Sequence, residues 1–438
     1  MRFYARRVRK GSAIMSKLLI KNALVVDPSQ ALEQTADLLI EDGLIAAIGP
    51  GLSGEGAQVI EAAGLVAIPG LVDMHVHLRD PGQTHKEDIL SGSEASAAGG
   101  FTSVACMPNT VPTVDSPETV RYIVDKAKDA KARVYPIASV TKGLSGGELC
   151  DYAALKAAGA VAVSDDGKPV KNAAVLQEAM ARAMDAGLPV ISHCEDLDII
   201  AGGIVNKGAV SEALGLPGMD RTSEDSITAR EIAIAAATGT RIHIAHVSTR
   251  GSAALIRDAK RRGVPVTAET CPHYFTLTQD KLLSRDADYR MNPPLREEAD
   301  RLAILDALCD GVFDCITTDH APHTADEKAD FTTAPNGVVG LETSLAVTLT
   351  MLYHTGKLPL SDIIWLMSES PASLLDIPGG DLRVGGPADL VLVDLEREWV
   401  VTPDELRSRS HNTPFKGMTL KGRPVLTVCG GLITHSLL

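Results

Sequence analysis

The sequence of 438 residues predicts an α/β protein, a (β/α)8 TIM barrel with a small β-sandwich domain formed from both termini. Two observations support this prediction. Between residues 69 and 380, short apolar runs alternate with helical segments, as in parallel barrels. Outside that range, both ends of the chain consist of short apolar runs separated by turns. A doubly wound sheet is the alternative, but we find no Gly-rich dinucleotide or phosphate loop to support it.

The two terminal segments share one pattern. Residues 17–67 and 383–438 alternate apolar runs with turns, and the pair Asp42-Gly43 between two runs predicts a hairpin. We therefore expect residues 16–68 and 381–438 to form one composite β-sandwich domain beside a barrel of residues 69–380. The first residues, 1–15, are basic. We expect them to be a disordered N-terminal extension, with a targeting peptide as the alternative.

Eight short apolar runs are the candidate barrel strands. A helix between the fourth and fifth runs is marked by its ends: Asn172 can cap its first turn, Gly187 can close it, and Pro189 blocks its continuation. In chain order the runs are "LVDMHVHL", "FTSVACMPN", "RVYPIASV", "GAVAVSDDG", "PVISHCED", "RIHIAHVS", "PVTAETCPHYF" and "DCITTDHAPH".

Composition narrows the class of partner. The net charge of −14 argues against nucleic acid and anionic membranes as partners. We find no apolar run long enough to span a bilayer, so no membrane association is expected. The seven cysteines are scattered without paired spacing, which predicts reduced thiols and a cytoplasmic protein.

Polar, chemically capable side chains follow these runs at their C-terminal ends, where barrels carry their active sites. A single strand-end histidine is usually structural, but burying so many titratable groups without a common partner would be costly. Imidazole and carboxylate ligands suit Zn²⁺ or a similar ion, and they outnumber the needs of one zinc. We therefore expect two metal ions, with a bridging hydroxide as the nucleophile. The side chains are His75, His77 and Arg79 after the first run, Asn109 after the second, Asp165 and Asp166 after the fourth, His193 after the fifth, His246 after the sixth and Asp319 after the eighth.

Strand alternation refines these expectations. His75 and His77 are two residues apart, so both imidazoles should face one side, and Arg79 should follow them. Cys194 adjoins His193 and should therefore point to the opposite face, where we expect it to pack.

Eight strings in order carry a resemblance to a known family: "PGLVDMHVHLRDPGQTHKEDI", "AGGFTSVACMPNT", "SDDGKPV", "SHCED", "IAHVSTRGS", "MNPPLR", "TTDHAPH" and "NGVVGLET", between Pro69 and Thr343. With them the chain resembles the amidohydrolase superfamily, and within it the bacterial class I dihydroorotases. The resemblance implies a zinc-dependent enzyme that interconverts N-carbamoyl-L-aspartate and L-dihydroorotate in pyrimidine biosynthesis. The implied ligands are His75 and His77 for one zinc ion, His193 and His246 for the other, and Asp166 as the bridge.

The bridge has an alternative, because many related hydantoinases and allantoinases use a carboxylated lysine. Lys168 and Lys171 lie just beyond the "SDDG" string and are the lysine candidates, whereas Asp165 is expected to support the site or cap a turn. Asp319 is the expected acid–base residue, since a carboxylate beside the nucleophile can move its proton to the leaving nitrogen. It could equally be a metal ligand, and both roles can hold together.

Substrate recognition is expected from several side chains around the metal ligands. Arg79 can grip a carboxylate with two parallel hydrogen bonds, although a structural salt bridge is the alternative. Asn109 and Asn292 offer neutral hydrogen bonds. The resemblance implies that His323 contacts substrate and that His320 supports the site. The residues expected to bind substrate are His77, Arg79, Asn109, Asn292, His323, Asn336 and Gly337, the last two through their backbone amides.

Two other functions remain open at this stage. The first is another cyclic amidohydrolase, a hydantoinase or allantoinase. The second is a non-catalytic homologue that scaffolds aspartate transcarbamoylase, although all the expected ligands are present. A homodimer and a complex with aspartate transcarbamoylase are both left open. The polar segment after Asp319, "HAPHTADEKADFTTAPNG", is expected to be a long loop, either a lid or an ordinary surface loop.

Overall fold

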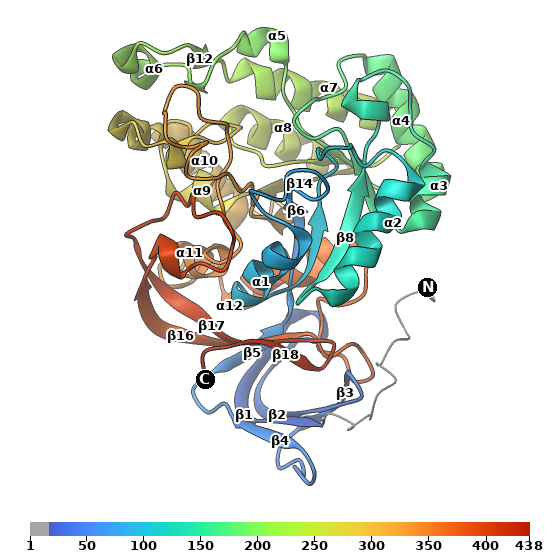
Figure 1. Cartoon of the computed structure of the whole chain (residues 1–438), viewed down its shortest axis with the longest axis vertical. Helices are drawn as coiled ribbons and strands as arrows, with labels where there is room; N and C mark the ends of the chain where they lie inside the picture. The colour runs from blue at the N-terminus through green and yellow to red at the C-terminus, as the bar shows by residue number, and fades with distance from the viewer. Residues whose placement is uncertain (1–16) are drawn as a thin grey trace.

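The computed structural model describes residues 17–438 and confirms the predicted fold class. A barrel with helices around it stands on a separate sheet that both ends of the chain build (Figure 1). The predicted extension, residues 1–15, lies outside the described residues. No helix among residues 17–438 is both long and apolar enough to cross a membrane.

The eight predicted runs form eight parallel strands in one sheet. The sheet closes where Val76, at the end of the first strand, pairs with His320 after the last, and the His77 N–H donates to the His320 carbonyl at 2.7 Å. The strands, in sheet order, are β6 (Leu71–Val76), β7 (Phe101–Cys106), β8 (Arg133–Ala138), β9 (Ala162–Ser164), β10 (Val190–Ser192), β13 (Ile242–Ile244), β14 (Val266–Thr270) and β15 (Cys315–Ile316).

Helices follow the barrel strands and pack around them (Figure 1). The predicted helix after β9 is confirmed as α4, because Asn172 caps its first turn and Gly187 ends it in the left-handed conformation, with φ 68°. The helices are α1 (Ile89–Ala98), α2 (Pro117–Lys126), α3 (Tyr152–Ala158), α4 (Ala173–Ala186), α5 (Leu197–Ile200), α6 (Ala209–Leu214), α7 (Thr222–Thr238), α8 (Arg250–Arg261), α9 (Pro272–Thr276), α10 (Glu298–Cys309), α11 (Ser344–Thr348), α12 (Leu360–Ile364) and α13 (Ser370–Leu375), with the two-residue strands β11 (Val205–Asn206) and β12 (Gly218–Met219) between α5 and α7.

The terminal sheet joins residues that are far apart in sequence, because β5 pairs with β1 on one side and with β16 on the other. Leu38 and Ile40 from the N-terminal part and Leu390 and Leu392 from the C-terminal part share a core separate from that of the barrel. The predicted hairpin is confirmed: Asp42-Gly43 joins β2 to β3. The strands are β1 (Leu18–Asp27), β2 (Leu32–Glu41), β3 (Leu44–Gly49), β4 (Gln58–Glu61), β5 (Val66–Pro69), β16 (Leu390–Val400), β17 (Thr419–Cys429) and β18 (Leu432–Ser436).

The connection between β16 and β17, residues 401–418, leaves the terminal sheet. Its Ser408 and Ser410 are buried and bond to the loop that follows β6. This part of the C-terminal segment therefore packs beside the loops at the C-terminal ends of the barrel strands, away from the terminal sheet.

Candidate active site

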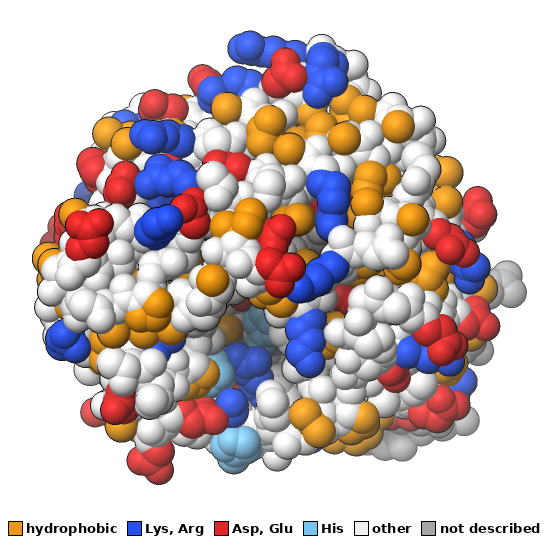
Figure 2. All heavy atoms as spheres, turned by 90° about the horizontal axis from the view of Figure 1, so that it is seen from above, with side chains coloured by type: hydrophobic (Ala, Val, Ile, Leu, Met, Phe, Trp, Pro, Cys, Tyr) orange, Lys and Arg blue, Asp and Glu red, His pale blue; other side chains and the backbone are white. Residues whose placement is uncertain are grey.

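The predicted ligands converge at the C-terminal end of the barrel. His75 is the second-last residue of β6, and Asp166, His193 and His246 each follow a strand by one or two residues. All four are buried, as is Asp319 after β15. Figure 2 views the molecule from the end opposite the terminal sheet and shows a hollow with histidine and basic side chains in it. Parallel strands bring these side chains together because all their carboxyl ends lie at one rim.

Asp166 is the centre of this cluster. Its Oδ1 lies 3.3 Å from His193 Nδ1, 3.6 Å from His75 Nε2 and 3.7 Å from His246 Nε2. Its Oδ2 lies 3.5 Å from His77 Nε2. Burial alone would raise the pKa of Asp166, but the neighbouring imidazoles of His193 and His246 hold it well below its usual range. One carboxylate therefore reaches all four histidines, as the predicted bridge must.

The donor set fits divalent metal ions. Although burial opposes it, Glu269, Asp319 and Asp166 raise the pKa of His75 to about 10, so the cluster attracts positive charge. His75 Nε2 and Asp166 Oδ1 are buried without a hydrogen-bond partner among the described residues. Two overlapping groups each bring three ligand atoms within 4.8 Å of one another. They are His75, His77 and Asp319, and His75, Asp166 and His246.

Neighbouring groups orient the imidazoles. His75 Nδ1 lies 2.6 Å from Glu269 Oε1, and His193 Nε2 lies 3.1 Å from Glu195 Oε2. Each contact turns the other ring nitrogen towards the site, which is how carboxylates orient histidines at metal centres. Sequence reasoning missed Glu269 and Glu195, although both lie in strings already noted, at the end of β14 and in "SHCED".

Asp319 lies on the side of the cluster formed by β6. Its Oδ1 is 3.2 Å from His77 Nε2 and 3.6 Å from His75 Nε2. Burial would raise the pKa of Asp319, but His77 and His75 lower it below its ordinary value. The side chain is thus an ionised carboxylate at neutral pH, which suits either a metal ligand or a proton acceptor.

The lysine alternatives to Asp166 lie away from the cluster. Lys168 and Lys171 are exposed, and Lys171 Nζ pairs with Asp198 at 2.9 Å on the surface. Asp165 turns to β8 and accepts a hydrogen bond from the Thr141 N–H at 3.0 Å, so it supports the strand ends. Cys194 is buried in the apolar core of the barrel, as alternation predicts.

Arg79 reaches the site by a different route from the one expected. β6 ends at Val76, and Arg79 has a left-handed backbone with φ 58°, so strand alternation does not aim its side chain. Instead its Nε donates to the Pro322 carbonyl at 3.2 Å, and Nη2 lies 3.2 Å from His323 Nε2. The guanidinium is buried and makes no ion pair with the described residues.

His323 is held as a neutral imidazole beside this guanidinium. Burial, Arg79 and Lys86 together lower its pKa to about 3. Its Nε2 lies 3.0 Å from the Asn336 carbonyl oxygen, and its Nδ1 lies 3.4 Å from Lys86 Nζ. The segment after Asp319 that carries His323 contains no helix or strand, as predicted for a long loop.

Asn109, Asn292 and Gly337 are expected to bind substrate, and they differ in the hydrogen bonds that their amide groups already make. Asn109 holds two candidate ligands, with Oδ1 2.9 Å from His77 Nδ1 and Nδ2 3.0 Å from Asp166 Oδ2. Its amide thus orients the His77 ring and the Asp166 carboxylate. Asn292 Oδ1 is buried without a hydrogen-bond partner among the described residues. The Gly337 N–H already donates to the Arg290 carbonyl at 3.0 Å, so the expected amide contact to a ring would have to share that bond.

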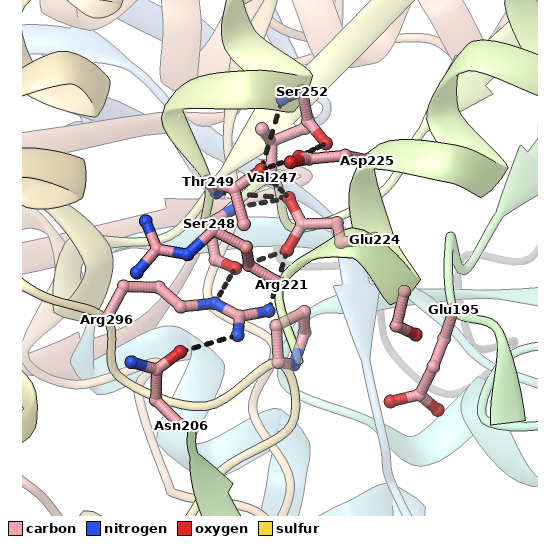
Figure 3. A network of polar contacts seen from close by, with 12 residues as sticks. Glu195, Asn206, Arg221, Glu224, Asp225, Val247, Ser248, Thr249, Ser252 and Arg296 are labelled. Carbon is pink, nitrogen blue, oxygen red and sulfur yellow. Dashed lines mark hydrogen bonds and ion pairs between the residues drawn. The ribbon is translucent and has the colours of Figure 1, made fainter. Parts of the chain in front are cut away.

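Two further features support the chain around the site. His320, predicted to support the site, lies with Nε2 3.5 Å from buried Glu87 and accepts the Gly340 N–H at Nδ1. Figure 3 shows a second feature, a polar network directly after His246. There Glu224 accepts the N–H groups of Ser248 and Thr249 at 3.0 and 3.1 Å.

The same network contains a buried ion pair (Figure 3). Glu224 pairs with Arg296 at 3.3 Å, and Arg296 also donates to Asn206 Oδ1 at 2.9 Å. The residues of this network come from separate segments of the chain. No periodic pattern in the sequence indicates that they are in contact.

A TIM barrel with histidines and aspartates gathered at its C-terminal strand ends defines a class, the amidohydrolases that can hold metal. Residues 64–252 match the family model described as dihydro-orotase-like. The chain belongs to the dihydroorotase family. It is 50% identical to the dihydroorotase of Trichlorobacter lovleyi over 422 residues, 96% of this chain and 99% of that one. It is also 50% identical to the dihydroorotase of Citrifermentans bemidjiense over 421 residues, 95% of this chain and 99% of that one.

Solved structures of similar fold carry other names. L-hydantoinase (dihydropyrimidinase) from Arthrobacter aurescens is 27% identical and superimposes with a TM-score of 0.86, over 97% of this chain and 96% of that one. Dihydropyrimidinase from Brevibacillus agri is 25% identical with a TM-score of 0.85, over 96% and 95%. Fold alone therefore does not separate dihydroorotases from hydantoinases, and the substrate must be argued from the site.

Proposed function

We propose that this chain is a metal-dependent dihydroorotase of the bacterial class I type. It interconverts N-carbamoyl-L-aspartate and L-dihydroorotate in the cytoplasm. Family membership supports the reaction, and Arg79 is the observation that supports the substrate. A buried guanidinium without a carboxylate partner among the described residues is costly unless a ligand pairs with it. Dihydroorotate carries a carboxylate that can pair with Arg79. The bond to be cleaved is an amide bond of the dihydroorotate ring.

We propose two zinc ions as the metal. His75 and His77 would hold one, His193 and His246 the other, and Asp166 would be shared between them. Asp166 fits this role because its two oxygens together approach all four imidazoles. When bound, such ions polarise a carbonyl oxygen and lower the pKa of water to near 7.

The chain's own residues then handle binding and proton movement. Arg79 binds the substrate carboxylate, and neutral His323 orients the guanidinium and the ring beside it. The Asp319 carboxylate accepts a proton from the attacking water at Oδ and delivers it to the ring nitrogen as the C–N bond breaks. One water is consumed: its oxygen enters the new carboxylate, one of its protons reaches the departing ring nitrogen, which becomes the ureido NH2, and the other proton is released to solvent. Cyclisation follows the same path in reverse, with Asp319 returning the proton.

The competing function is that of a hydantoinase, which the structural neighbours favour. A ring with an apolar substituent would leave Arg79 unpaired, so the proposal predicts turnover of dihydroorotate and rejection of a 5-alkyl hydantoin. Steady-state kinetics on both rings, with metal content measured on the same sample, test this. Comparable turnover of both rings would refute the substrate assignment.

Replacing the guanidinium gives the sharper test. Arg79→Met should retain metal and reduce kcat/KM for dihydroorotate by about 10²-fold or more, the scale of a charge-assisted contact of roughly 3 kcal/mol. Arg262→Met is the matched control, because Arg262 pairs with Asp258 on the exposed face of α8. An unchanged kcat/KM in Arg79→Met would contradict the proposal.

Two assemblies are compatible with this function, a homodimer and a complex with aspartate transcarbamoylase. Sedimentation of the chain alone and mixed with aspartate transcarbamoylase, with turnover measured on the same samples, distinguishes them. A purely scaffolding role predicts no turnover in either sample.

A further inference from the structure

We propose that Asn412 is a positioning residue for the substrate half of the site. Together with residues 407–410 it connects two loops of the active site, the loop after β6 and the loop that carries His323. The proposal deepens the proposed dihydroorotase function and rests on it. We call residues 407–410 and Asn412 the C-terminal brace. They lie in the connection between β16 and β17, far in sequence from every residue of the barrel end.

The side chain and the backbone carbonyl of Asn412 make hydrogen bonds to the loop that carries His323. Its Oδ1 accepts the His323 N–H at 3.1 Å. Its Nδ2 donates to the carbonyls of Gly337 at 3.0 Å and Ala321 at 3.4 Å. Its own carbonyl accepts the Val339 N–H at 3.1 Å. Asn412 is buried, so all four bonds are made away from water.

These four contacts join the two ends of one loop. Residues 321 and 323 follow Asp319 directly, whereas residues 337 and 339 form the return of the same segment. The two ends are also bonded to each other directly, because the Ala321 N–H donates to the Val338 carbonyl at 2.7 Å. The Asn412 amide adds the bonds that hold the His323 N–H and the Gly337 carbonyl, and with them the place of His323 against Arg79. An alanine at position 412 would leave two buried carbonyls and one N–H without these partners, which a native structure avoids.

The rest of the brace holds the loop after β6, which carries Arg79. The Ser410 hydroxyl donates to the Lys86 carbonyl at 2.7 Å, and the Ser408 hydroxyl donates to Glu87. Arg409 pairs with Asp88, the N-cap of α1. The backbone N–H groups of Arg407 and Ser408 donate to Glu342 at 2.8 and 3.0 Å. The brace thus sets the loop of Arg79 and the loop of His323 relative to each other.

The four histidines and Asp166 make none of the brace's contacts. His75 lies within β6, and Asp166, His193 and His246 directly follow β9, β10 and β13, where carboxylates and the Asn109 amide orient the rings. Loss of the brace should therefore weaken the grip on the substrate while the metal stays bound. A residue that only stabilises the fold would not produce this separation.

The test is Asn412→Ala in the full-length, zinc-loaded protein. We expect KM for dihydroorotate to rise by about 10-fold or more with zinc content unchanged, because the substrate contacts are displaced and the ligands are not. Hydrogen–deuterium exchange should become faster at residues 321–339, whose amides lose their anchor. Asn412→Asp is the second variant, because it has the same size and keeps the acceptor for His323 but turns an oxygen towards the two carbonyls. We expect the same changes in KM and exchange from it.

His411→Ala is the matched control, since the neighbouring side chain is exposed and lies outside the brace. An unchanged KM in both Asn412 variants, or a loss of zinc in parallel with the rise in KM, would overturn the proposal. If the wild type failed to turn over dihydroorotate, the proposed function would fail instead. Exchange at residues 321–339 would then decide the brace alone: faster exchange supports it and unchanged exchange overturns it.

Discussion

At the scale of single residues, the proposed two-metal site depends on which residue bridges the two ions. Asp166 is buried among four imidazoles, whereas Lys168 and Lys171 face solvent. We predict that Asp166→Ala loses bound metal and activity together, while Lys168→Ala and Lys171→Ala retain both. Elemental analysis beside steady-state kinetics measures this. Loss of half of the metal in either lysine variant would reverse the assignment.

Glu269 provides the second prediction at this scale. It is fully buried, contacts His75 Nδ1 at 2.6 Å and His243 Nε2 at 3.1 Å, and accepts the His246 N–H at 3.3 Å. Replacing it with Gln should let the His75 ring reorient. We expect metal affinity to fall about 10- to 100-fold, with activity recovered at high zinc concentration.

The control for Glu269 is another buried carboxylate. Asp389 is fully buried and pairs with Arg133 at the opposite end of the barrel. Asp389→Asn should lower thermal stability and leave the zinc dissociation constant unchanged. Equal zinc affinity in wild type and Glu269→Gln would show that the contact is structural only.

At the scale of elements, the active-site loops depend on contacts with other parts of the chain, whereas the strands follow from local sequence patterns. The loop that contains Gly337 is the sharpest case. Gly337 has φ 140°, and a Cβ there would lie 2.7 Å from the Ala321 carbonyl oxygen and 3.0 Å from His323 Cδ2. Only glycine fits this approach, because any side chain would push His323 away from Arg79.

We therefore predict that Gly337→Ala raises KM for dihydroorotate by about 10-fold or more and leaves zinc content unchanged. Gly356→Ala is the matched control. It also has a positive φ, of 70°, but open space around the added Cβ, so it tests the loss of a positive-φ glycine without the clash. Kinetics on the two variants separate these effects, and equal KM values for both would contradict the role of the clash.

At the scale of the whole molecule, the C-terminal segment couples the terminal sheet to the barrel through Glu342. Burial raises the pKa of this carboxyl to about 7, from an ordinary value of 4.5. The proton is thus retained in the folded chain at a pH where the unfolded chain has lost it. The resulting stabilisation is complete below about pH 4.5 and is lost as pH rises through 7.

Glu342→Gln removes this titration. We predict that the melting temperature of the wild type, taken relative to Glu342→Gln, falls by about 2 °C or more between pH 5 and pH 8. Thermal denaturation at several pH values, with exposed Glu178→Gln as control, measures the difference. A difference independent of pH would show that Glu342 does not titrate in this range.

Much of the fold and part of the site could be predicted because local patterns carry them. Each barrel strand is an apolar run of its own, and the candidate ligands His75, His193 and His246 lie at the end of such a run or within two residues after it. Asp42-Gly43 and the caps of α4 are likewise decided within a few residues of chain. By contrast, strand alternation predicts that Arg79 faces the site, but a left-handed turn and a bond to the Pro322 carbonyl orient its side chain.

The sequence by itself determined the barrel, the sheet built from both termini and the candidate ligands at the strand ends. Periodicity and residue type are properties of short segments, and parallel strands bring their ends together in any such barrel. Only the tertiary structure decided that Glu269 orients His75, that Glu224 holds the chain after His246, and that Asn412 reaches the loop of His323. These contacts join residues tens to hundreds of positions apart. A buried hydrogen bond between distant residues has no characteristic spacing in the sequence, so the sequence does not reveal which residue is the partner.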